Sequence, residues 1–287
     1  MENFIQVGET RVGLETPVVM GILNVTADSF HDGGKYVSES QVVARVNEIA
    51  EQGAAIIDVG ACSTRPGALP VSEKEEIARL SFAVELVRRY HPHLPVSIDT
   101  YRANVAREII DCLGEVMVND ISGGTMDDRM FPTVAELNAP YVLTHVQGTP
   151  LDMQRAPHYD DVAREVHRFL EERVGRLRGM GCTRLIVDPG FGFGKSVAHN
   201  YRLMDCLERF LDLGCPLLAG VSRKSMICKL LGITPAEALN GTTVLNTIAL
   251  AKGAAILRVH DVKEAVEAVK IYHATRTLED ENEDARQ

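Results

Sequence analysis

Eight short apolar runs, separated by longer amphipathic stretches, follow one another along most of the chain. Their length and apolar content are typical of strands buried on both faces. The runs lie at 18–25, 55–60, 96–99, 115–121, 141–146, 184–188, 216–222 and 255–260. Strands that alternate with helices form parallel sheets, and eight such units in 287 residues predict a closed (β/α)8 (TIM) barrel of the α/β class. An open doubly wound sheet is the alternative, because periodicity alone does not separate the two folds.

Helix starts between these runs carry capping residues. The clearest helical segments are predicted at 38–52, 72–90, 160–178 and 234–252. Ser38 and Ser72 stand at the N-cap positions of the first two, and Pro235 occupies the first helical position of the last. These boundaries support the alternation of strands and helices.

The chain is predicted to be a single domain, because no Pro/Gly/Ser-rich linker and no break in composition divides it. The barrel is expected over 18–273, after an N-terminal segment, 1–17, that leads into it. Residues 274–287 form an acidic run, which favours a disordered, solvated tail.

Composition limits the possible partners. A formal net charge of -10 argues against a general binder of nucleic acid or of anionic membranes, but not against a local basic pocket. No apolar run approaches membrane-spanning length, and the first residues lack the pattern of a secretory signal. Six scattered cysteines without a CxxC pair indicate neither a zinc site nor a disulfide framework, so a cytoplasmic location is expected.

Most of the eight runs end in polar or charged residues. These residues are Asn24, Asp58, Asp99, Asn119 with Asp120, His145, Asp188, Ser222 to Lys224, and Arg258 with His260. One such residue alone is usually a helix cap or a satisfied core group. Because the carboxyl ends of parallel strands share one face of the sheet, the whole set predicts the walls of one polar cavity.

The cavity residues divide by their chemistry. Asp99, Asn119 and Asp188 suit the edge of a flat, amide-like heterocycle, since a carboxylate can accept two parallel N–H bonds. Lys224 and Arg258, with a potentially cationic His260, suit an anion such as a phosphate.

Two further assignments concern Asn24 and His145. Asn24 offers one oxygen ligand, which is enough for Mg²⁺ when phosphate and water supply the others. His145 lies within an apolar run and is predicted to be a structural histidine.

Three glycine- or turn-rich segments follow strands. Segments 26–34 and 61–67 are interpreted as lids over the cavity, with ordinary surface loops as the alternative. In 185–195 (LIVDPGFGFGK) a strand ends in a carboxylate and runs into a glycine-rich turn. This turn ends in Gly-Lys-Ser like a P-loop, but its glycine spacing is one residue too short for that motif.

The order and spacing of these motifs closely resemble the dihydropteroate synthases of the pterin-binding enzyme family. The motifs that carry the resemblance are MGILNVT at 20–26, STRPG at 63–67, SIDTY at 97–101, VNDISGG at 118–124, QGTP at 147–150, DPGFGFGK at 188–195, SRKS at 222–225 and RVHD at 258–261. The chain departs from the usual family pattern at Ala27, His31, Ala61, Cys62, Thr144 and Val146.

The resemblance implies a (β/α)8 barrel, usually a homodimer, that joins 4-aminobenzoate to (7,8-dihydropterin-6-yl)methyl diphosphate in folate synthesis. It implies Mg²⁺ at Asn24. The implied pterin-binding residues are Asp99, Asn119, Asp188, Lys224 and Arg258. The implied diphosphate-binding residues are Asn24, Thr64, Arg258 and His260. The implied 4-aminobenzoate pocket consists of Phe30, Thr64, Pro66, Phe193 and Ser225. The residues expected to act in catalysis are Asp99, Asp188, Lys224, Arg258 and His260.

Three alternatives remain at this point. A methyltetrahydrofolate-binding methyltransferase domain would share the pterin half of the site but lack the motifs at 63–67 and 222–225. A non-catalytic pterin-binding paralogue would keep the fold without the activity. An unrelated sugar-phosphate barrel enzyme would not need carboxylates for a heterocycle edge.

Overall fold

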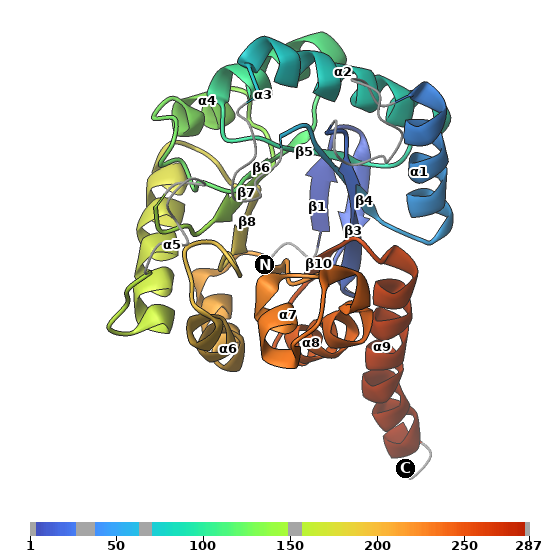
Figure 1. The fold of residues 1–287 in the computed structure, drawn as a ribbon, viewed down its shortest axis with the longest axis vertical. Helices are drawn as coiled ribbons and strands as arrows, with labels where there is room; N and C mark the ends of the chain where they lie inside the picture. Colours follow the sequence, from blue (N-terminus) through green and yellow to red (C-terminus); the bar gives the residue numbers. More distant parts are fainter. Residues whose placement is uncertain (1–3, 27–37, 63–70, 149–156, 285–287) are drawn as a thin grey trace.

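The computed structural model describes residues 4–26, 38–62, 71–148 and 157–284 (Figure 1). Its main sheet has eight parallel strands in the order β8-β7-β6-β5-β4-β3-β10-β9. The strands are β3 (Val18–Asn24), β4 (Ile56–Gly60), β5 (Val96–Asp99), β6 (Met117–Asp120), β7 (Tyr141–Thr144), β8 (Leu185–Asp188), β9 (Leu218–Ala219) and β10 (Ile256–Val259). Each lies inside one of the eight predicted runs, although β9 is only two residues long.

The sheet closes on itself between its first and last strands. A parallel bridge joins Val187 of β8 to Leu217, directly before β9, and the Val187 N–H donates to the carbonyl of Pro216 at 3.0 Å. The closure confirms the barrel and excludes the open doubly wound sheet.

Helices surround the barrel (Figure 1). They are α1 (Glu39–Glu51), α2 (Glu73–Tyr90), α3 (Ala103–Leu113), α4 (Met130–Glu136), α5 (Val162–Gly179), α6 (Val197–Asp205), α7 (Ser225–Leu231), α8 (Leu239–Ala251) and α9 (Val262–Asp284), with 3-10 turns at Leu207–Leu213 and Pro235–Glu237. The predicted caps are confirmed at Ser38 and Ser72, whose side chains accept from the N–H groups of Gln41 and Glu75. Pro235 begins a 3-10 turn that precedes α8.

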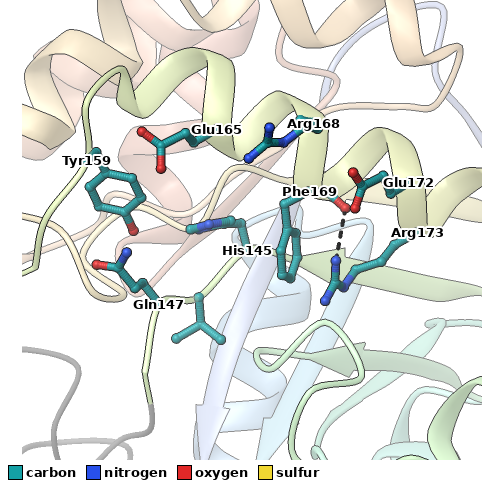
Figure 2. A pocket seen from close by; sticks show the side chains of 9 residues that line it. His145, Gln147, Tyr159, Glu165, Arg168, Phe169, Glu172 and Arg173 are labelled. Carbon is teal, nitrogen blue, oxygen red and sulfur yellow. Dashed lines mark hydrogen bonds between the residues drawn. The ribbon is translucent and has the colours of Figure 1, made fainter.

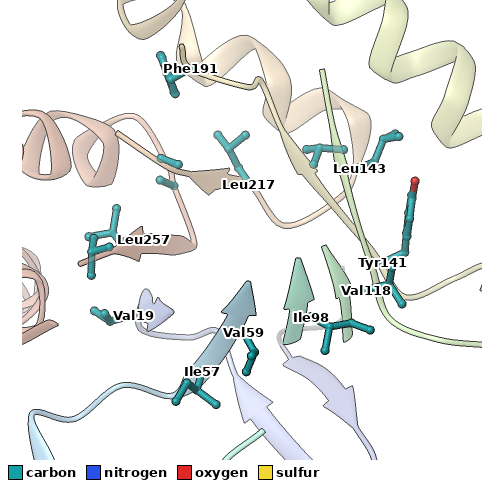
Figure 3. Close-up of a cluster of buried hydrophobic side chains, with 14 of the residues drawn as sticks. Val19, Ile57, Val59, Ile98, Val118, Tyr141, Leu143, Phe191, Leu217 and Leu257 are labelled. Atoms are coloured by element: carbon teal, nitrogen blue, oxygen red, sulfur yellow. The ribbon is translucent and has the colours of Figure 1, made fainter. Parts of the chain in front are cut away.

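Strand side chains alternate between two apolar cores. Outward-facing residues such as Val19, Ile57 and Leu257 pack in the layer under the helices (Figure 3). Their neighbours Met20 and Ile56 belong to a second cluster inside the barrel. The period of two therefore determines which residues face the barrel interior.

An antiparallel hairpin of β1 (Phe4–Val7) and β2 (Thr10–Gly13) covers the end of the barrel at which the strands begin. Ile5, Val7 and Val12 are buried in the interior cluster. The segment 1–17, predicted only to lead into the barrel, thus supplies part of its core.

The last helix, α9, continues to Asp284 and points away from the barrel (Figure 1). Over 274–284 this helix differs from the disordered tail predicted for 274–287, and 285–287 lie outside the described residues. No Pro or Gly occurs after position 261 to end the helix, and Glu and Ala favour helical backbone. Among the described residues, none of the helices has the length and apolar content needed to span a membrane.

Candidate active site

Six of the predicted cavity residues face the interior at the carboxyl ends of the strands, whereas Asp120 faces outward to Tyr141 and His145 packs against Phe169 outside the barrel interior. Each of the six follows an apolar residue that points outward into the helix layer, so the alternation turns the polar side chain inward. These outward–inward pairs are Leu23–Asn24, Ile57–Asp58, Ile98–Asp99, Val118–Asn119, Val187–Asp188 and Leu257–Arg258. One rim of the barrel therefore gathers them, as the sequence predicts.

The register of neighbouring strands places three of these polar residues at the same level of the barrel. Asn24 pairs with Gly60, Gly60 with Asp99, and Asp99 with Asn119 on successive strands. Gly60 leaves space between its neighbours, since a Cβ there would lie 3.2 Å from Asn24 Oδ1 and 3.7 Å from Asp99 Cβ. Because Gly60 has no side chain, the side chains of Asn24 and Asp99 both border the space next to it.

A second glycine, Gly220, lies among the other polar residues of the rim. A Cβ at Gly220 would lie 3.8 Å from Asp188 Oδ2, 3.9 Å from Lys224 Nζ and 3.9 Å from Arg258 Cβ. An acid and two bases from three different segments therefore meet around Gly220.

Arg258 links the two halves through ion pairs. Its Nε donates to Asp58 Oδ2 at 2.6 Å, and a terminal nitrogen donates to Asp99 Oδ2 at 2.8 Å. The same Asp58 oxygen accepts from Asn119 Nδ2 at 3.0 Å. Using its amide nitrogen in this way leaves Asn119 with a carbonyl oxygen for a ligand.

Asp58 is central to this network, although the sequence pattern predicts it only as a polar strand end. Asp58 is completely buried and holds both Arg258 and Asn119. A sequence signal was present, because a lone carboxylate between Ile57 and Val59 must face the interior when they face outward. Its partners on other strands were not visible in the sequence.

Burial moves the protonation equilibria of the rim toward neutral pH. Desolvation raises the pKa of Asp99 to about 7, against the attraction of the Arg258 charge. It likewise raises the pKa of Asp188, against the attraction of Lys224. Burial lowers the pKa of Lys224 to about 8, although Asp188 favours its charged form. A ligand that donates N–H groups to these carboxylates would favour their ionised forms.

Lys224 is held by the glycine-rich turn after β8. Its Nζ donates to the carbonyl of Phe191 at 2.5 Å and lies 4.4 Å from the centroid of the Phe193 ring. The same turn donates the Gly190 N–H to Asp188 Oδ1 at 2.7 Å. Phe193 thus lies beside the predicted ring-binding groups.

His260 differs from the potentially cationic group expected from the sequence. Its Nδ1 is 3.0 Å from Ser222 Oγ, which also accepts the His260 backbone N–H at 3.2 Å. Burial and the nearby Arg258 charge lower the pKa of His260 to about 4. The imidazole is therefore neutral near pH 7 and can contribute hydrogen bonds but no full charge.

The remaining predicted residues divide into described and undescribed positions. Ser225 is exposed at the start of α7, next to Lys224. Phe30, Thr64 and Pro66 lie outside the described residues, as do most of the two predicted lid segments. His145 is buried and packs edge-on against Phe169 at 4.7 Å between ring centroids, as expected of a structural histidine.

The described residues contain no group of three or more His, Cys, Asp or Glu side chains placed to hold a metal ion. Asn24 is half-buried at the rim, and its Oδ1 lies 3.2 Å from the place that a Cβ at Gly60 would occupy. A single amide oxygen fits a Mg²⁺ ion that takes its other ligands from a substrate phosphate and water.

The fold and rim define a (β/α)8-barrel protein with one polar site at the carboxyl ends of its strands. The sequence pattern of the "Pterin binding enzyme" family matches residues 20–260, and the chain belongs to that family. The dihydropteroate synthase of Escherichia coli strain K12 is 45% identical over 268 residues, covering 93% of this chain and 94% of the relative.

Solved structures of dihydropteroate synthases are similar to this chain in both fold and sequence. A Xanthomonas albilineans dihydropteroate synthase with 4-aminobenzoic acid has a TM-score of 0.89 and 40% identity, covering 96% of this chain and 99% of that one. The same organism's enzyme in complex with 7,8-dihydropteroate has a TM-score of 0.84 and 38% identity, covering 95% and 98%. Within its family the chain groups with the dihydropteroate synthases, which are transferases of folate biosynthesis.

Proposed function

We propose that this chain joins 4-aminobenzoate to (7,8-dihydropterin-6-yl)methyl diphosphate, giving 7,8-dihydropteroate and diphosphate. The observation that carries the proposal is the meeting of heterocycle-edge acceptors with buried bases at one rim. Relatives solved with 4-aminobenzoic acid and with 7,8-dihydropteroate support these substrates.

The pterin ring is proposed to lie among Asp99, Asn119 and Asp188. Asp188 can accept two parallel N–H bonds from the amino-imine edge of the ring, a strong and directional contact. The Asn119 carbonyl adds an acceptor whose direction is fixed by Asp58. Lys224 lies close to Asp188 and can donate to a ring acceptor.

The diphosphate is proposed to lie toward Arg258, His260 and Asn24. Arg258 supplies positive charge where the leaving group becomes more negative, which is electrostatic catalysis of departure. Neutral His260 contributes a hydrogen bond, and the resemblance adds Thr64. Asn24 would hold Mg²⁺, which would neutralise charge on the leaving diphosphate.

The proposed reaction is a dissociative substitution. The bond between the methylene carbon and the diphosphate oxygen breaks, and the oxygen keeps the electron pair. Asp99 and Asp188 favour the positive charge left on the pterin-methyl group. The amine of 4-aminobenzoate then forms the new C–N bond and loses a proton. Its pocket is proposed at Phe193 and Ser225, with Phe30, Thr64 and Pro66 added by the resemblance.

The test is direct turnover by the purified chain. Dihydropterin diphosphate, 4-aminobenzoate and Mg²⁺ should yield dihydropteroate and diphosphate in equal amounts, and omitting 4-aminobenzoate should abolish dihydropteroate. Tight pterin binding without product would instead indicate the non-catalytic paralogue. Methyl transfer from methyltetrahydrofolate would indicate the methyltransferase domain.

The chain is further proposed to act as a cytoplasmic homodimer. All six cysteines are free, which suits a reducing compartment. Apolar side chains are exposed on α7 and α8, at Leu230, Leu231, Val244 and Ile248. An exposed apolar patch of this kind is typical of an interface between subunits.

A further inference from the structure

Lys195 is a deeply buried cation next to the candidate site, and the proposed reaction does not use it. Only 3% of its surface is exposed. Its Nζ has four partners: the Gly190 carbonyl at 2.8 Å, His145 Nδ1 at 2.9 Å, the Phe193 carbonyl at 3.0 Å and the His145 carbonyl at 3.4 Å. Burial lowers the pKa of Lys195 well below its usual value, although the Asp188 charge favours the charged form. An ammonium group has three N–H donors and so satisfies the three closest partners, whereas a neutral amine satisfies two.

These partners belong to two loops that follow neighbouring strands. His145 follows β7, whereas Gly190 and Phe193 belong to the turn after β8. The backbones of the two loops are in close contact, since a Cβ at Gly190 would lie 1.9 Å from the His145 carbonyl oxygen. The backbone of Gly190 also has φ +71°, which favours glycine. Lys195 therefore ties two closely fitted loops at their contact.

The turn that Lys195 holds makes three contacts with residues of the candidate site. It donates the Gly190 N–H to Asp188, accepts the Lys224 ammonium at the Phe191 carbonyl, and places the Phe193 ring beside Lys224. A change in the turn would move all three together.

We propose that Lys195 and His145 act as a pair of positioning residues, which hold the turn after β8 so that Asp188, Lys224 and Phe193 keep their places in the site. The inference rests on the proposed function for its kinetic consequence, but the link between the two side chains is testable by itself.

The link determines the tautomer of His145. When the Lys195 ammonium donates across this 2.9 Å contact, His145 Nδ1 is the acceptor and the proton of the neutral ring lies on Nε2. Burial and the Lys195 charge lower the pKa of His145 well below its usual value, which keeps the ring neutral. On the α5 side, His145 lines a pocket of 260 Å³ with Tyr159 and Phe169 (Figure 2).

The first experiment is independent of activity. In ¹⁵N-histidine-labelled protein, His145 is assigned by loss of its signals in His145→Asn. It should show a non-protonated Nδ1 and a protonated Nε2 across neutral pH, and Lys195→Met should change the Nδ1 shift. A protonated Nδ1 in the wild-type protein would overturn the pairing.

The second experiment measures steady-state kinetics. Lys195→Met should lower kcat/KM for dihydropterin diphosphate by about 10- to 100-fold, mainly through KM, because displacement by about an ångström has effects of this size. The matched control is Lys252→Met. Lys252 also donates to a carbonyl, that of Asp205, and to Glu208, but it lies at the opposite end of the barrel, before β10. The kcat/KM of Lys252→Met should stay within about twofold of the wild-type value.

Substitutions of His145 separate positioning from packing. In His145→Asn the amide oxygen can replace Nδ1 as the acceptor for Lys195, whereas His145→Leu fills the space without an acceptor. His145→Asn should keep most of the kcat/KM that His145→Leu loses, even if both variants unfold at the same temperature. Equal kinetic loss in both would contradict the proposal, and this pair decides the question if Lys195→Met does not fold.

The two proposals fail differently. If the wild-type chain forms no dihydropteroate, the proposed function fails, while the histidine spectra and the affinity for dihydropterin diphosphate still test the pair. If wild type is active and Lys195→Met has unchanged KM and kcat, only the positioning role fails.

Discussion

Asp58 shows how one buried residue can define the polarity of a site. A carboxylate that accepts from both Arg258 and Asn119 keeps the guanidinium in place and leaves the Asn119 carbonyl oxygen as an acceptor for a ligand. A buried acid without such partners would be strongly unfavourable. The network therefore favours a ligand edge made of N–H donors.

Asp58→Asn should weaken the binding of dihydropterin diphosphate by roughly 10-fold or more, because a charged acceptor shared by two site residues is lost. Calorimetric titration measures the change. Asp120→Asn is the matched control: Asp120 is also a buried carboxylate, but it faces outward and accepts from Tyr141 and Gly124. The control should lose stability but bind as wild type. Equal affinity in Asp58→Asn and wild type would contradict the role of Asp58.

The rim also predicts the pH dependence of kcat/KM, which reports the free enzyme. Asp99, with a pKa of about 7, must lose its proton to accept from the pterin, so activity rises through this pH. Lys224, with a pKa of about 8, must keep its proton, so activity falls above it. Initial rates at low substrate should give a maximum between these values. A flat profile from about pH 5.5 to 9.5 would contradict the assignment.

At the scale of elements, one end of the barrel contributes mainly to stability and the other end carries the candidate site. The hairpin β1–β2 fills the end at which the strands begin, and the site occupies the end at which they finish. Glu115 and Arg184 fasten this hairpin, because Glu115 accepts from the Gly8 N–H at 2.6 Å and Arg184 donates to the Gln6 carbonyl at 3.1 Å. Mutations in the hairpin should therefore affect unfolding rather than catalysis.

Ile5→Ala should lower the free energy of unfolding by about 2–4 kcal/mol, since it leaves a cavity in the interior cluster. Urea unfolding measures the loss, and kcat/KM should be unchanged at temperatures where the variant is folded. Arg11→Ala, at a more exposed position of the same hairpin, serves as the control and should cost less. Loss of activity in a folded Ile5→Ala protein would contradict this separation.

The elements that could be predicted from sequence are those with repeated local signals. Eight strands and the best capped helices follow from apolar runs and from residues such as Ser38 and Ser72. The hairpin was missed because its two four-residue strands alternate too briefly to stand out. The common location of the site residues followed from strand polarity, whereas the partners of Asp58 and Lys195 depend on three-dimensional contacts between distant segments.

At the scale of the whole molecule, the exposed apolar residues of α7 and α8 predict self-association. Leu231 of α7 lies against α8, since a Cβ at Gly241 would be 3.3 Å from its Cδ1. Leu231 and Val244 are both more than half exposed. Burying such side chains between two subunits removes apolar surface from water.

Light scattering after size exclusion should give twice the chain mass of 31.5 kDa for the wild-type protein. Val244→Glu combined with Leu231→Glu should shift it to the mass of one chain, because buried unpaired charges are unfavourable. Phe82→Glu, at an exposed apolar position on α2, should leave the mass unchanged. A monomeric wild-type protein would exclude the proposed homodimer.

The central claim is that one rim binds both halves of the substrate through different residues. Calorimetry with 6-hydroxymethyl-7,8-dihydropterin and with its diphosphate, in wild type, Asp188→Ala and His260→Ala, tests it most directly. Asp188→Ala should weaken both ligands by roughly 10- to 100-fold, because it removes the charged acceptor for the ring. His260→Ala should weaken only the diphosphate. Wild-type affinity of Asp188→Ala for both ligands would contradict the account.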